Sequence, residues 1–389
     1  MKNISRKEFL KTSGAVSAGV MISPALAGRP MSAGQAKKTR VGVIGCGSVS
    51  NAYLPHLSAC PYAEIVSACD IRYERAVAQA ESFNIPHTYP HIDQMLAGAP
   101  FDLLVNLTDM QEHGRLNKIG LTAGKHVWSE KPLANTVEEG KELLQLAKSR
   151  DLRLWGAPVV VNSPQFAFMS EAIRSGKLGR ISSAHAHYGH LGPTWSAFFY
   201  EKGGGSLPDL GVYNLATLTG LLGPAKYVTA MTSIVTPVRK TDNKGEVQVE
   251  AEDNAMVLMD HGNGVLSHVQ SGFNYFDPYG HTGTGQDRPT VLVWGTRGNM
   301  GLVGYDWAPF GVDLATMDHE EPERHANDAR GYVWQEGASV VAEALATGKD
   351  TLVTAEHSLH VLEVIEAARK SGRTGERIQI TTDFKYPVL

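Results

Sequence analysis

Cysteine is scarce in this sequence, and the common zinc-binding patterns are missing from it. The 389 residues include three cysteines, Cys46, Cys60 and Cys69, whose odd number and irregular spacing predict no disulfide framework. No CxxC or HExxH pattern occurs, and the sequence indicates no structural or hydrolytic zinc site. We therefore expect small buried cysteines and no bound metal.

Charge and hydropathy exclude two further classes of protein. The formal net charge is -4 and no long basic block occurs, so we expect no nucleic-acid partner. The apolar residues 12–26 are too few and too rich in glycine and serine for a membrane span. With 42% hydrophobic and 20% charged residues, the chain is typical of a globular protein long enough for two domains.

The first residues resemble an export signal. The charged string from Ser5 to Lys11 precedes the apolar residues 12–26, and Ala25-Leu26-Ala27 is an A-x-A cleavage pattern. We predict a signal peptide over residues 1–27, a flexible linker over 28–37, and export to the periplasm. The string is similar to a twin-arginine signal with Lys7 at the second arginine, and the alternative is an amphipathic N-terminal helix of a cytoplasmic protein.

Apolar strands alternate with amphipathic helices over the first half of the chain. We expect strands at residues 39–45, 65–70, 101–106, 126–129 and 152–155. We expect one helix from about residue 51 and three more over residues 74–83, 111–123 and 137–149. This order predicts βαβ units, a parallel sheet and a Rossmann domain over residues 38–156.

The pattern changes near residue 157. After a helix at 163–175, alternating strands are expected at 181–188, 227–234, 254–259, 265–271, 290–294 and 300–303, with hairpin turns at 260–264 and 295–299. A last helix begins after Thr354 and ends near residue 372. We therefore predict an α/β protein whose second domain, residues 157–389, is α+β with a large antiparallel sheet.

A glycine turn joins the first strand to the first helix. Gly45 permits a tight turn, Gly47 permits close approach of a pyrophosphate, and the small Ser50 permits close helix–strand packing. The helix amides would face the phosphates. Asp70 ends the next strand, where a carboxylate binds ribose hydroxyls, so NAD is favoured over NADP; Arg72 is the opposing signal.

Four motifs together carry a family resemblance, and they are Gly45-Cys46-Gly47, Asn106-Leu107-Thr108 with His113, Glu130-Lys131-Pro132, and the glycine-rich run from Gly203 through Asp209 to Tyr213. Over roughly residues 38–375 the chain resembles the GFO/IDH/MocA oxidoreductases, which include glucose–fructose oxidoreductase and inositol dehydrogenases. The resemblance implies a Rossmann domain followed by an open-faced antiparallel sheet, used for substrate binding and for homodimer or homotetramer contacts. Many members have histidine where this chain has Tyr213, whereas the exported glucose–fructose oxidoreductase has tyrosine.

The resemblance implies hydride transfer between a nicotinamide cofactor and a hydroxyl of a sugar, glycoside or polyol. Lys131 would polarise the reacting oxygen, and Tyr213 would pass the proton, its pKa lowered by the lysine charge. If a helix starts at Pro208, Asp209 shares a face with Tyr213 and binds a hydroxyl or orients the pair. The structural alternatives are a solvated lysine, a helix-terminal aspartate and a packed tyrosine.

The remaining site residues are predicted from the motif positions and from the chemistry of sugars. The cofactor set is Gly45, Cys46, Gly47, Ser48, Val49, Asp70, Ile71, Arg72, Asn106, Thr108, His113, Glu130 and Lys131. Sugar hydroxyls need polar partners and C–H faces stack on rings, so the substrate set is Asn162, His187, Trp195, Tyr200 and Lys202, with His185 and Tyr275 as further candidates. His185 and His187 share one strand face, where we favour hydrogen bonding over a metal.

Export and NAD binding together predict tightly bound NAD that is not released between turnovers, because free NAD is not expected outside the cytoplasm. Turnover then needs a second half-reaction in the same site. Sugar–sugar oxidoreduction, a glycosidase that works by transient oxidation and elimination, and glycoside oxidation with another acceptor are the enzymatic alternatives. The alternative of another class is a non-catalytic sugar-binding protein.

Overall fold

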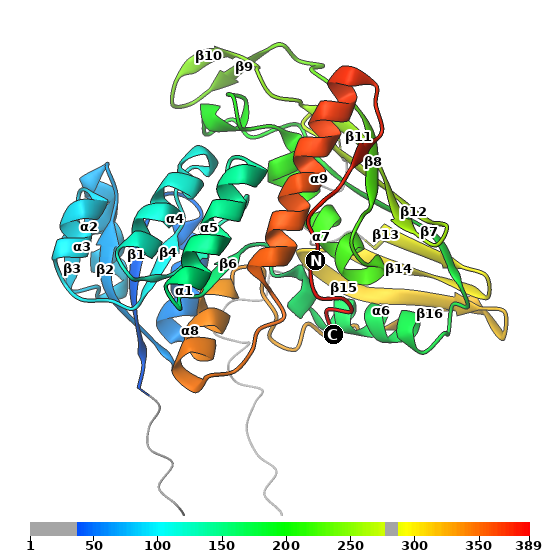
Figure 1. The fold of residues 1–389 in the computed structure, drawn as a ribbon, viewed down its shortest axis with the longest axis horizontal. Coiled ribbons are helices and arrows are strands. Elements are labelled where there is room, and N and C mark those ends of the chain that lie inside the picture. Colours follow the sequence, from blue (N-terminus) through cyan, green and yellow to red (C-terminus); the bar gives the residue numbers. More distant parts are fainter. Residues whose placement is uncertain (1–36, 277–286) are drawn as a thin grey trace, which may run out of the picture. The chain divides into compact units, whose positions relative to one another are not determined.

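The computed structural model describes residues 37–276 and 287–389 (Figure 1). The predicted signal peptide, and the predicted linker up to residue 36, lie outside the described residues. The described part contains a six-stranded sheet, a nine-stranded sheet and a two-stranded ribbon. The ribbon consists of β9 (Val238–Thr241) and β10 (Gly245–Gln248).

The six-stranded sheet has the order β3-β2-β1-β4-β5-β6, which is the doubly wound order of a Rossmann domain. All its pairings are parallel, as predicted. Its strands are β1 (Thr39–Ile44), β2 (Ala63–Cys69), β3 (His87–Tyr89), β4 (Leu103–Asn106), β5 (His126–Ser129) and β6 (Leu154–Gly156). The sequence did not predict β3, because its three residues are too few to show an alternation.

The helices between these strands are α1 (Ser50–Ala59), α2 (Tyr73–Phe83), α3 (Ile92–Ala97), α4 (His113–Thr122) and α5 (Val137–Ser149). A further helix, α8 (Gly337–Thr347), comes from the C-terminal half of the sequence but packs against β1 and α1. Thr39 Oγ1 donates a hydrogen bond to the Ala342 carbonyl at 2.8 Å. A Cβ on Gly337 would lie 2.1 Å from the Trp128 ring, which shows how closely α8 approaches this sheet.

The nine-stranded sheet has the order β16-β15-β14-β13-β7-β12-β11-β8-β17. Its strands are β7 (Ile181–Gly189), β8 (Tyr227–Ser233), β11 (Asn254–Gly262), β12 (Val265–Gly272), β13 (Pro289–Gly295), β14 (Gly298–Tyr305), β15 (Ala308–Thr316), β16 (His319–His325) and β17 (Ile378–Gln379). Both predicted hairpins are confirmed. The predicted large antiparallel sheet is confirmed, and it contains one parallel pair, β7 with β12, which the long connection between these strands permits.

Helices cover one face of the nine-stranded sheet, as Figure 1 shows for α6 (Pro164–Arg174), α7 (Val212–Leu222) and α9 (Ala355–Thr374). The opposite side, here called the open face, carries exposed apolar side chains. They are Met231, Met256, Leu258, Leu266 and Trp294. Strand register aligns Met256 with Met231 and Leu258 with His268, so these residues lie on one surface. Within the described residues, no helix is long and apolar enough to cross a bilayer.

A partly buried ion pair explains the glycine run before α7. Arg369 on α9 donates from Nε to Glu252 Oε2 at 2.8 Å and from Nη2 to Glu252 Oε1 at 3.0 Å and to the Gly204 carbonyl. Gly205 has φ +107, and a Cβ there would lie 2.5 Å from Glu252 Oε1. The run is therefore a close-packed segment that places the following turn, rather than a flexible lead into a helix.

The first prediction concerns Gly205. Gly205→Ala should lower the free energy of unfolding by about 2 kcal/mol or more, because the positive φ and the contact with Glu252 both oppose a side chain. Denaturant unfolding measures the loss. Gly124→Ala is the matched control, since Gly124 also has a positive φ but has no atom within 4 Å of a built Cβ. A loss in the control that equals or exceeds the loss in Gly205→Ala would contradict this explanation.

Candidate active site

The carboxyl ends of β1, β4 and β5 meet at one edge of the six-stranded sheet. Gly45 follows β1, Leu107 follows β4 and Glu130 follows β5. The strand order reverses between β1 and β4, and such switch points are where doubly wound sheets bind ligands. Gly45 has φ +88 and a built Cβ would lie 2.5 Å from the Leu107 carbonyl carbon, so the turn requires glycine.

Asp70 organises the glycine turn. Its Oδ2 accepts a hydrogen bond from the Cys46 amide at 2.8 Å, and its Oδ1 accepts one from the Arg72 amide at 2.8 Å. A Cβ on Gly47 would meet only Arg75 Nη1, at 3.5 Å, so the backbone there is open to a close ligand. Open glycine backbone, a helix N-terminus and an ordered carboxylate fit the pyrophosphate and ribose of NAD.

The other residues predicted around the turn divide by exposure. Ser48, Ile71 and Arg72 are exposed, Val49 is half-buried and Cys46 is buried. Burial, and then the neighbouring Asp70 charge, raises the pKa of the Cys46 thiol to about 12. Cys46 therefore remains a neutral thiol, as its prediction as a small buried residue requires.

His113 and Asn106 support the site from behind. The His113 side chain is buried, with Nδ1 2.8 Å from the Pro132 carbonyl and Nε2 2.9 Å from the Thr108 carbonyl. Asn106 Oδ1 accepts from Thr108 Oγ1 at 2.7 Å, and its Nδ2 donates to Asn117 Oδ1 at 2.9 Å. Their polar atoms bind protein groups, so both side chains hold the β4 loop against the Lys131 segment, while their role as cofactor contacts stays a prediction. Thr108 is half-buried beside them.

Lys131 reaches across to the C-terminal half of the chain. Its Nζ donates to Asp209 Oδ1 at 2.8 Å and to the Asp209 carbonyl at 2.8 Å. The two side chains are 12% and 13% exposed, so the pair is largely shielded but not closed off. The solvated-lysine alternative is excluded by this geometry, and Lys131 and Asp209 form one unit.

Asp209 lies in a π turn, Leu207–Gly211, and α7 begins only at Val212. The helical segment considered from Pro208 therefore begins as a π turn and continues as an α-helix. A π turn changes the hydrogen-bond register of a helix, and such turns are frequent at functional sites. Lys131 Nζ lies 5.3 Å from the centre of the Tyr213 ring, so Asp209 and Tyr213 both contact the lysine in spite of the changed register.

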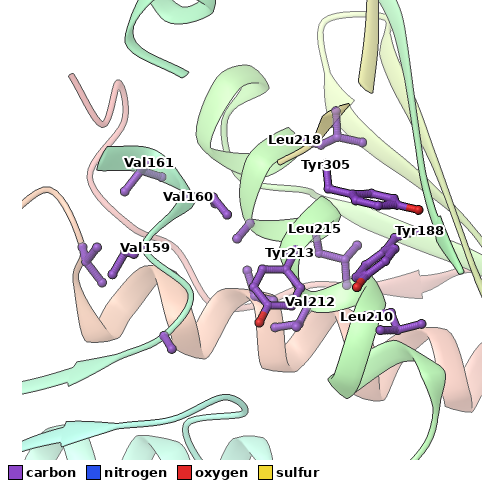
Figure 2. Close-up of a cluster of buried hydrophobic side chains, with 14 of the residues drawn as sticks. Val159, Val160, Val161, Tyr188, Leu210, Val212, Tyr213, Leu215, Leu218 and Tyr305 are labelled. Atoms are coloured by element: carbon purple, nitrogen blue, oxygen red, sulfur yellow. The ribbon is translucent and has the colours of Figure 1, made fainter. Parts of the chain in front are cut away.

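Tyr213 is buried in an aromatic and aliphatic cluster with Tyr188 and Leu215, as Figure 2 shows. Burial, and then the charges of Glu130, Asp209 and Asp306, raise the pKa of Tyr213 well above its usual value. The prediction that Lys131 lowers this pKa was wrong. Burial is the largest cause of the raised pKa, the charges of the three carboxylates add to it, and Lys131 is itself paired with Asp209.

Glu130 is also buried, and its carboxylate faces protein donors. Tyr53 on α1 donates its hydroxyl to Glu130 Oε1 at 2.6 Å, and the Lys131 amide donates to Oε2 at 3.0 Å. Sequence reasoning missed Tyr53, because it lies on α1, far in sequence from every catalytic motif. Its fully buried ring, on the helix that follows the glycine turn, is a signal that becomes readable only in three dimensions.

A second missed residue is Asp306, in the turn between β14 and β15. Its Oδ2 accepts from Asn214 Nδ2 and Thr217 Oγ1, both at 2.9 Å, so it is tied to α7 next to Tyr213. Burial raises the pKa of Asp306 to about 6. Only strand pairing in the nine-stranded sheet brings this turn to α7, and no sequence motif marks it.

Two predicted substrate residues lie elsewhere. Tyr200 is 1% exposed and its hydroxyl donates to the Pro193 carbonyl at 2.6 Å, so we correct it to a packing residue. His187 alternates with Tyr188 along β7, and Tyr188 faces Tyr213. His187 therefore points to the open face, where it stacks on His185; His185 Nδ1 lies 2.8 Å from His268 Nδ1.

The other substrate candidates stay predictions, and only Trp195 and Lys202 lie in the segment before the π turn. Trp195 is 47% exposed and packs edge-on against Phe198 and Phe199. Lys202 is exposed, and its carbonyl accepts from Gln111 of the Rossmann half at 3.3 Å. Asn162 Nδ2 donates to Glu336 Oε1 at 3.0 Å. The Tyr275 hydroxyl donates to Asn254 Oδ1 at 2.9 Å.

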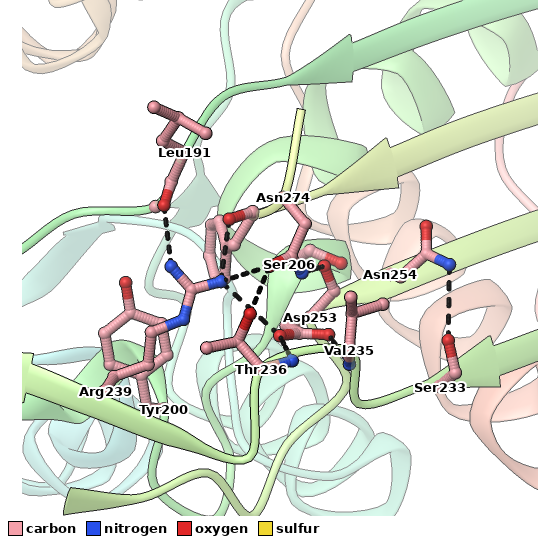
Figure 3. Close-up of polar contacts among 12 residues, drawn as sticks. Leu191, Tyr200, Ser206, Ser233, Val235, Thr236, Arg239, Asp253, Asn254 and Asn274 are labelled. Atoms are coloured by element: carbon pink, nitrogen blue, oxygen red, sulfur yellow. Dashed lines mark hydrogen bonds and ion pairs between the residues drawn. The ribbon is translucent and has the colours of Figure 1, made fainter. Parts of the chain in front are cut away.

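Arg239 on β9 fixes the same segment. Figure 3 shows its guanidinium donating to the Leu191 carbonyl at 2.7 Å and to Asn274 Oδ1 at 2.7 Å, while it approaches Asp253 Oδ2 at 3.5 Å. The Tyr200 ring lies 5.3 Å beneath it. The β9–β10 ribbon therefore holds the segment that leads to the π turn.

Comparisons with known proteins agree with this architecture. A model of the oxidoreductase family with an NAD-binding Rossmann fold matches residues 39–157, and a model of the GFO/IDH/MocA C-terminal domain matches residues 166–301. The trans-1,2-dihydrobenzene-1,2-diol dehydrogenase of Mus musculus is 25% identical over 342 residues, which cover 85% of this chain and 96% of that protein. The 1,5-anhydro-D-fructose reductase of Ensifer adhaerens is 24% identical over 350 residues, 88% of this chain and 99% of that protein.

The solved structure of levoglucosan dehydrogenase in complex with NADH has a TM-score of 0.78 and 20% identity, and the match covers 89% of this chain and 100% of that one. This likeness shows the fold. The two family models together cover the six-stranded sheet, strands β7 to β13 with the start of β14, and the motifs that meet at Lys131. The chain therefore belongs to the GFO/IDH/MocA oxidoreductase family and has an NAD-binding Rossmann domain.

Proposed function

We propose that this chain transfers a hydride between NAD and a hydroxyl-bearing carbon of a sugar, glycoside or polyol. The observation that carries the proposal is the Lys131–Asp209 pair, held at the switch point of the NAD-binding sheet. When bound, NAD supplies the hydride acceptor or donor. The names of relatives that act on a diol and on an anhydro-sugar support this substrate class.

Lys131 is the electrophilic group of the proposed reaction. An ammonium has three N–H donors, and the two described hydrogen bonds to Asp209 use two of them. The third donates to the reacting oxygen and stabilises the negative charge that develops on it. Asp209 fixes the direction of that third N–H donor, because its backbone carbonyl and its Oδ1 both accept hydrogen bonds from the ammonium.

Tyr213 is the proton-transfer group. Its raised pKa keeps the phenol protonated near neutral pH. The hydroxyl then donates to a ketone oxygen when the carbonyl is reduced. In the oxidation direction it must first lose its proton to act as a base, so oxidation should accelerate as the pH rises toward the pKa of Tyr213.

The decisive experiment measures bound nucleotide and turnover together. Denatured protein should release NAD or NADH, and a panel of sugars and polyols should change nicotinamide absorbance in single-turnover assays. Lys131→Met should lower the rate about 100-fold or more and leave NAD binding intact, because it removes a donor to the developing charge. Lys125→Met is the control, since Lys125 contacts Phe101 away from the pair.

Two results would defeat the proposal. Absence of bound NAD together with no affinity for added NAD would remove the redox function and leave the sugar-binding alternative. Near-normal turnover in Lys131→Met would remove the assigned role of the lysine. Release of an aglycone without net change in NADH would instead identify the glycosidase alternative.

The Tyr213 environment yields a pH prediction. Asp306→Asn removes a buried negative charge and keeps an oxygen for Asn214 and Thr217. Above pH 6, where Asp306 is ionised in the parent protein, its loss should lower the pKa of Tyr213. The rising limb of the oxidation rate should therefore move to lower pH by roughly 0.5–1 unit.

Rate–pH profiles of the parent protein and the variant check this shift. Asp313→Asn, which removes a carboxylate paired with Arg324 further along β15, is the control and should leave the profile in place. If the rising limb of the oxidation rate of Asp306→Asn does not move, or moves to higher pH, the assignment of Tyr213 as the proton-transfer group is contradicted.

We further propose that the enzyme is exported, that it retains NAD, and that it forms a homo-oligomer. The signal-like residues 1–27 support export. Retention follows from export, since a released cofactor would be lost and each turnover needs a second sugar or another acceptor to restore it. The apolar residues of the open face support an oligomer, because such a surface on a soluble chain usually marks a protein contact.

One experiment addresses these three properties. Protein recovered from the periplasmic fraction should begin near residue 28, should keep nucleotide through gel filtration, and should have the light-scattering mass of a dimer or tetramer. Recovery in the cytoplasm with residues 1–27 attached would contradict export. Nucleotide lost on the column would contradict retention, and a monomeric mass would contradict the oligomer.

A further inference from the structure

Glu130 carries a buried carboxylate that forms no ion pair with the ammonium of the adjacent lysine. It is 5% exposed, and the ammonium of the next residue, Lys131, is committed to Asp209. Among the described residues, the donors to the Glu130 carboxylate are the Tyr53 hydroxyl and the Lys131 amide. A buried carboxylate is costly unless donors satisfy it, so the Tyr53 hydroxyl carries much of this compensation.

Tyr53 is well placed to hold that carboxylate rigidly. The residue is 0% exposed on α1, the helix that starts three residues earlier at Ser50, directly after the glycine turn. Its ring lies 6.5 Å from Trp128 of β5 and meets Trp334 edge-on at 6.3 Å. The hydroxyl stays protonated, because burial and then the Glu130 charge raise the pKa of Tyr53 well above its usual value.

The bonds form a continuous path from the cofactor turn to the lysine. It runs from the glycine turn into α1, through the Tyr53 hydroxyl to one oxygen of Glu130, and from the other oxygen to the Lys131 amide. The Tyr53–Glu130 bond is 2.6 Å long and buried, and the bond from the Lys131 amide is 3.0 Å long and partly buried, so the two bonds tie the backbone of Lys131 to the helix that receives the pyrophosphate. The same carboxylate lies near the Tyr213 phenol, whose pKa it raises.

We propose that Tyr53 is a positioning residue for catalysis: its hydroxyl fixes the Glu130 carboxylate, which in turn fixes the Lys131 backbone relative to the cofactor-binding turn. Tyr53 does not touch the reacting atoms and acts through Glu130. This inference rests on the proposed function for its catalytic consequence, but its structural part, the fixed Lys131 amide, is measurable without turnover.

Tyr53→Phe tests the proposal, because it keeps the ring against Trp128 and Trp334 and removes only the hydroxyl. We expect turnover to fall about 10- to 100-fold, the range expected for losing a hydrogen bond to a charged group, with KM and NAD affinity within about 2-fold of the parent protein. Tyr386→Phe is the matched control: it also removes a tyrosine hydroxyl bond, to the Leu221 carbonyl at 2.8 Å, but far from Lys131 in sequence and in the opposite half.

A double-mutant cycle separates positioning from general stability. If Tyr53 acts through Glu130, then Tyr53→Phe in a Glu130→Gln background should cost little beyond Glu130→Gln alone. Independent, additive losses would overturn the proposal, as would turnover within about 2-fold of the parent protein in Tyr53→Phe. Loss of NAD affinity that accounts for the whole defect would also overturn it, since Tyr53 would then serve cofactor binding.

Hydrogen exchange gives a readout that does not depend on activity. The peptide containing the Lys131 amide should exchange faster in Tyr53→Phe than in the parent protein, and Tyr386→Phe should leave it unchanged. Unchanged exchange in Tyr53→Phe would overturn the positioning role. If the parent protein itself shows no turnover with any sugar, the proposed function fails, while the exchange result still decides whether Tyr53 fixes Lys131.

Discussion

The ion pair between Lys131 and Asp209 is the interaction on which the site depends. Lys131 lies just after β5 of the parallel sheet and Asp209 lies in the π turn before α7, so one contact joins the two halves of the described chain. Both hydrogen bonds of the lysine go to the same residue, which leaves the ammonium oriented rather than merely neutralised. The geometry of the π turn, the glycine run and the Arg369–Glu252 pair matters because it delivers Asp209 to this point.

Negative charge dominates the interior behind that pair. Glu130, Asp209 and Asp306 come from three different elements, and all of them raise the pKa of Tyr213. A phenol in such surroundings holds its proton firmly. An adjacent lysine would oppose this effect if it were free, but the lysine is already paired. The pKa of Tyr213 therefore follows first from burial and then from the nearby carboxylates, and not from the lysine of the motif.

The sequence predicted the features that are local or periodic. Strand–helix alternation indicated the Rossmann sheet, and the glycine turn, Asp70 and Lys131 could be placed because they lie at strand ends. The contacts between segments that are distant in the sequence could not be predicted from it. The parallel contact of β7 with β12, the packing of α8 on β1, and the approach of Tyr53 and Asp306 to the site depend on contacts between distant segments. His187 was assigned to the site because alternation shows which residues share a face, but not which face meets α7.

The position of α8 has a consequence for the order in which the molecule is completed. This helix is synthesised after the whole nine-stranded sheet except β17, yet it covers Trp128 and β1 of the first sheet. A growing chain that has not reached Gly337 therefore leaves part of the nucleotide-binding half unfinished. The nucleotide-binding half is therefore synthesised before the nine-stranded sheet, but its packing is completed only after most of that sheet has been made.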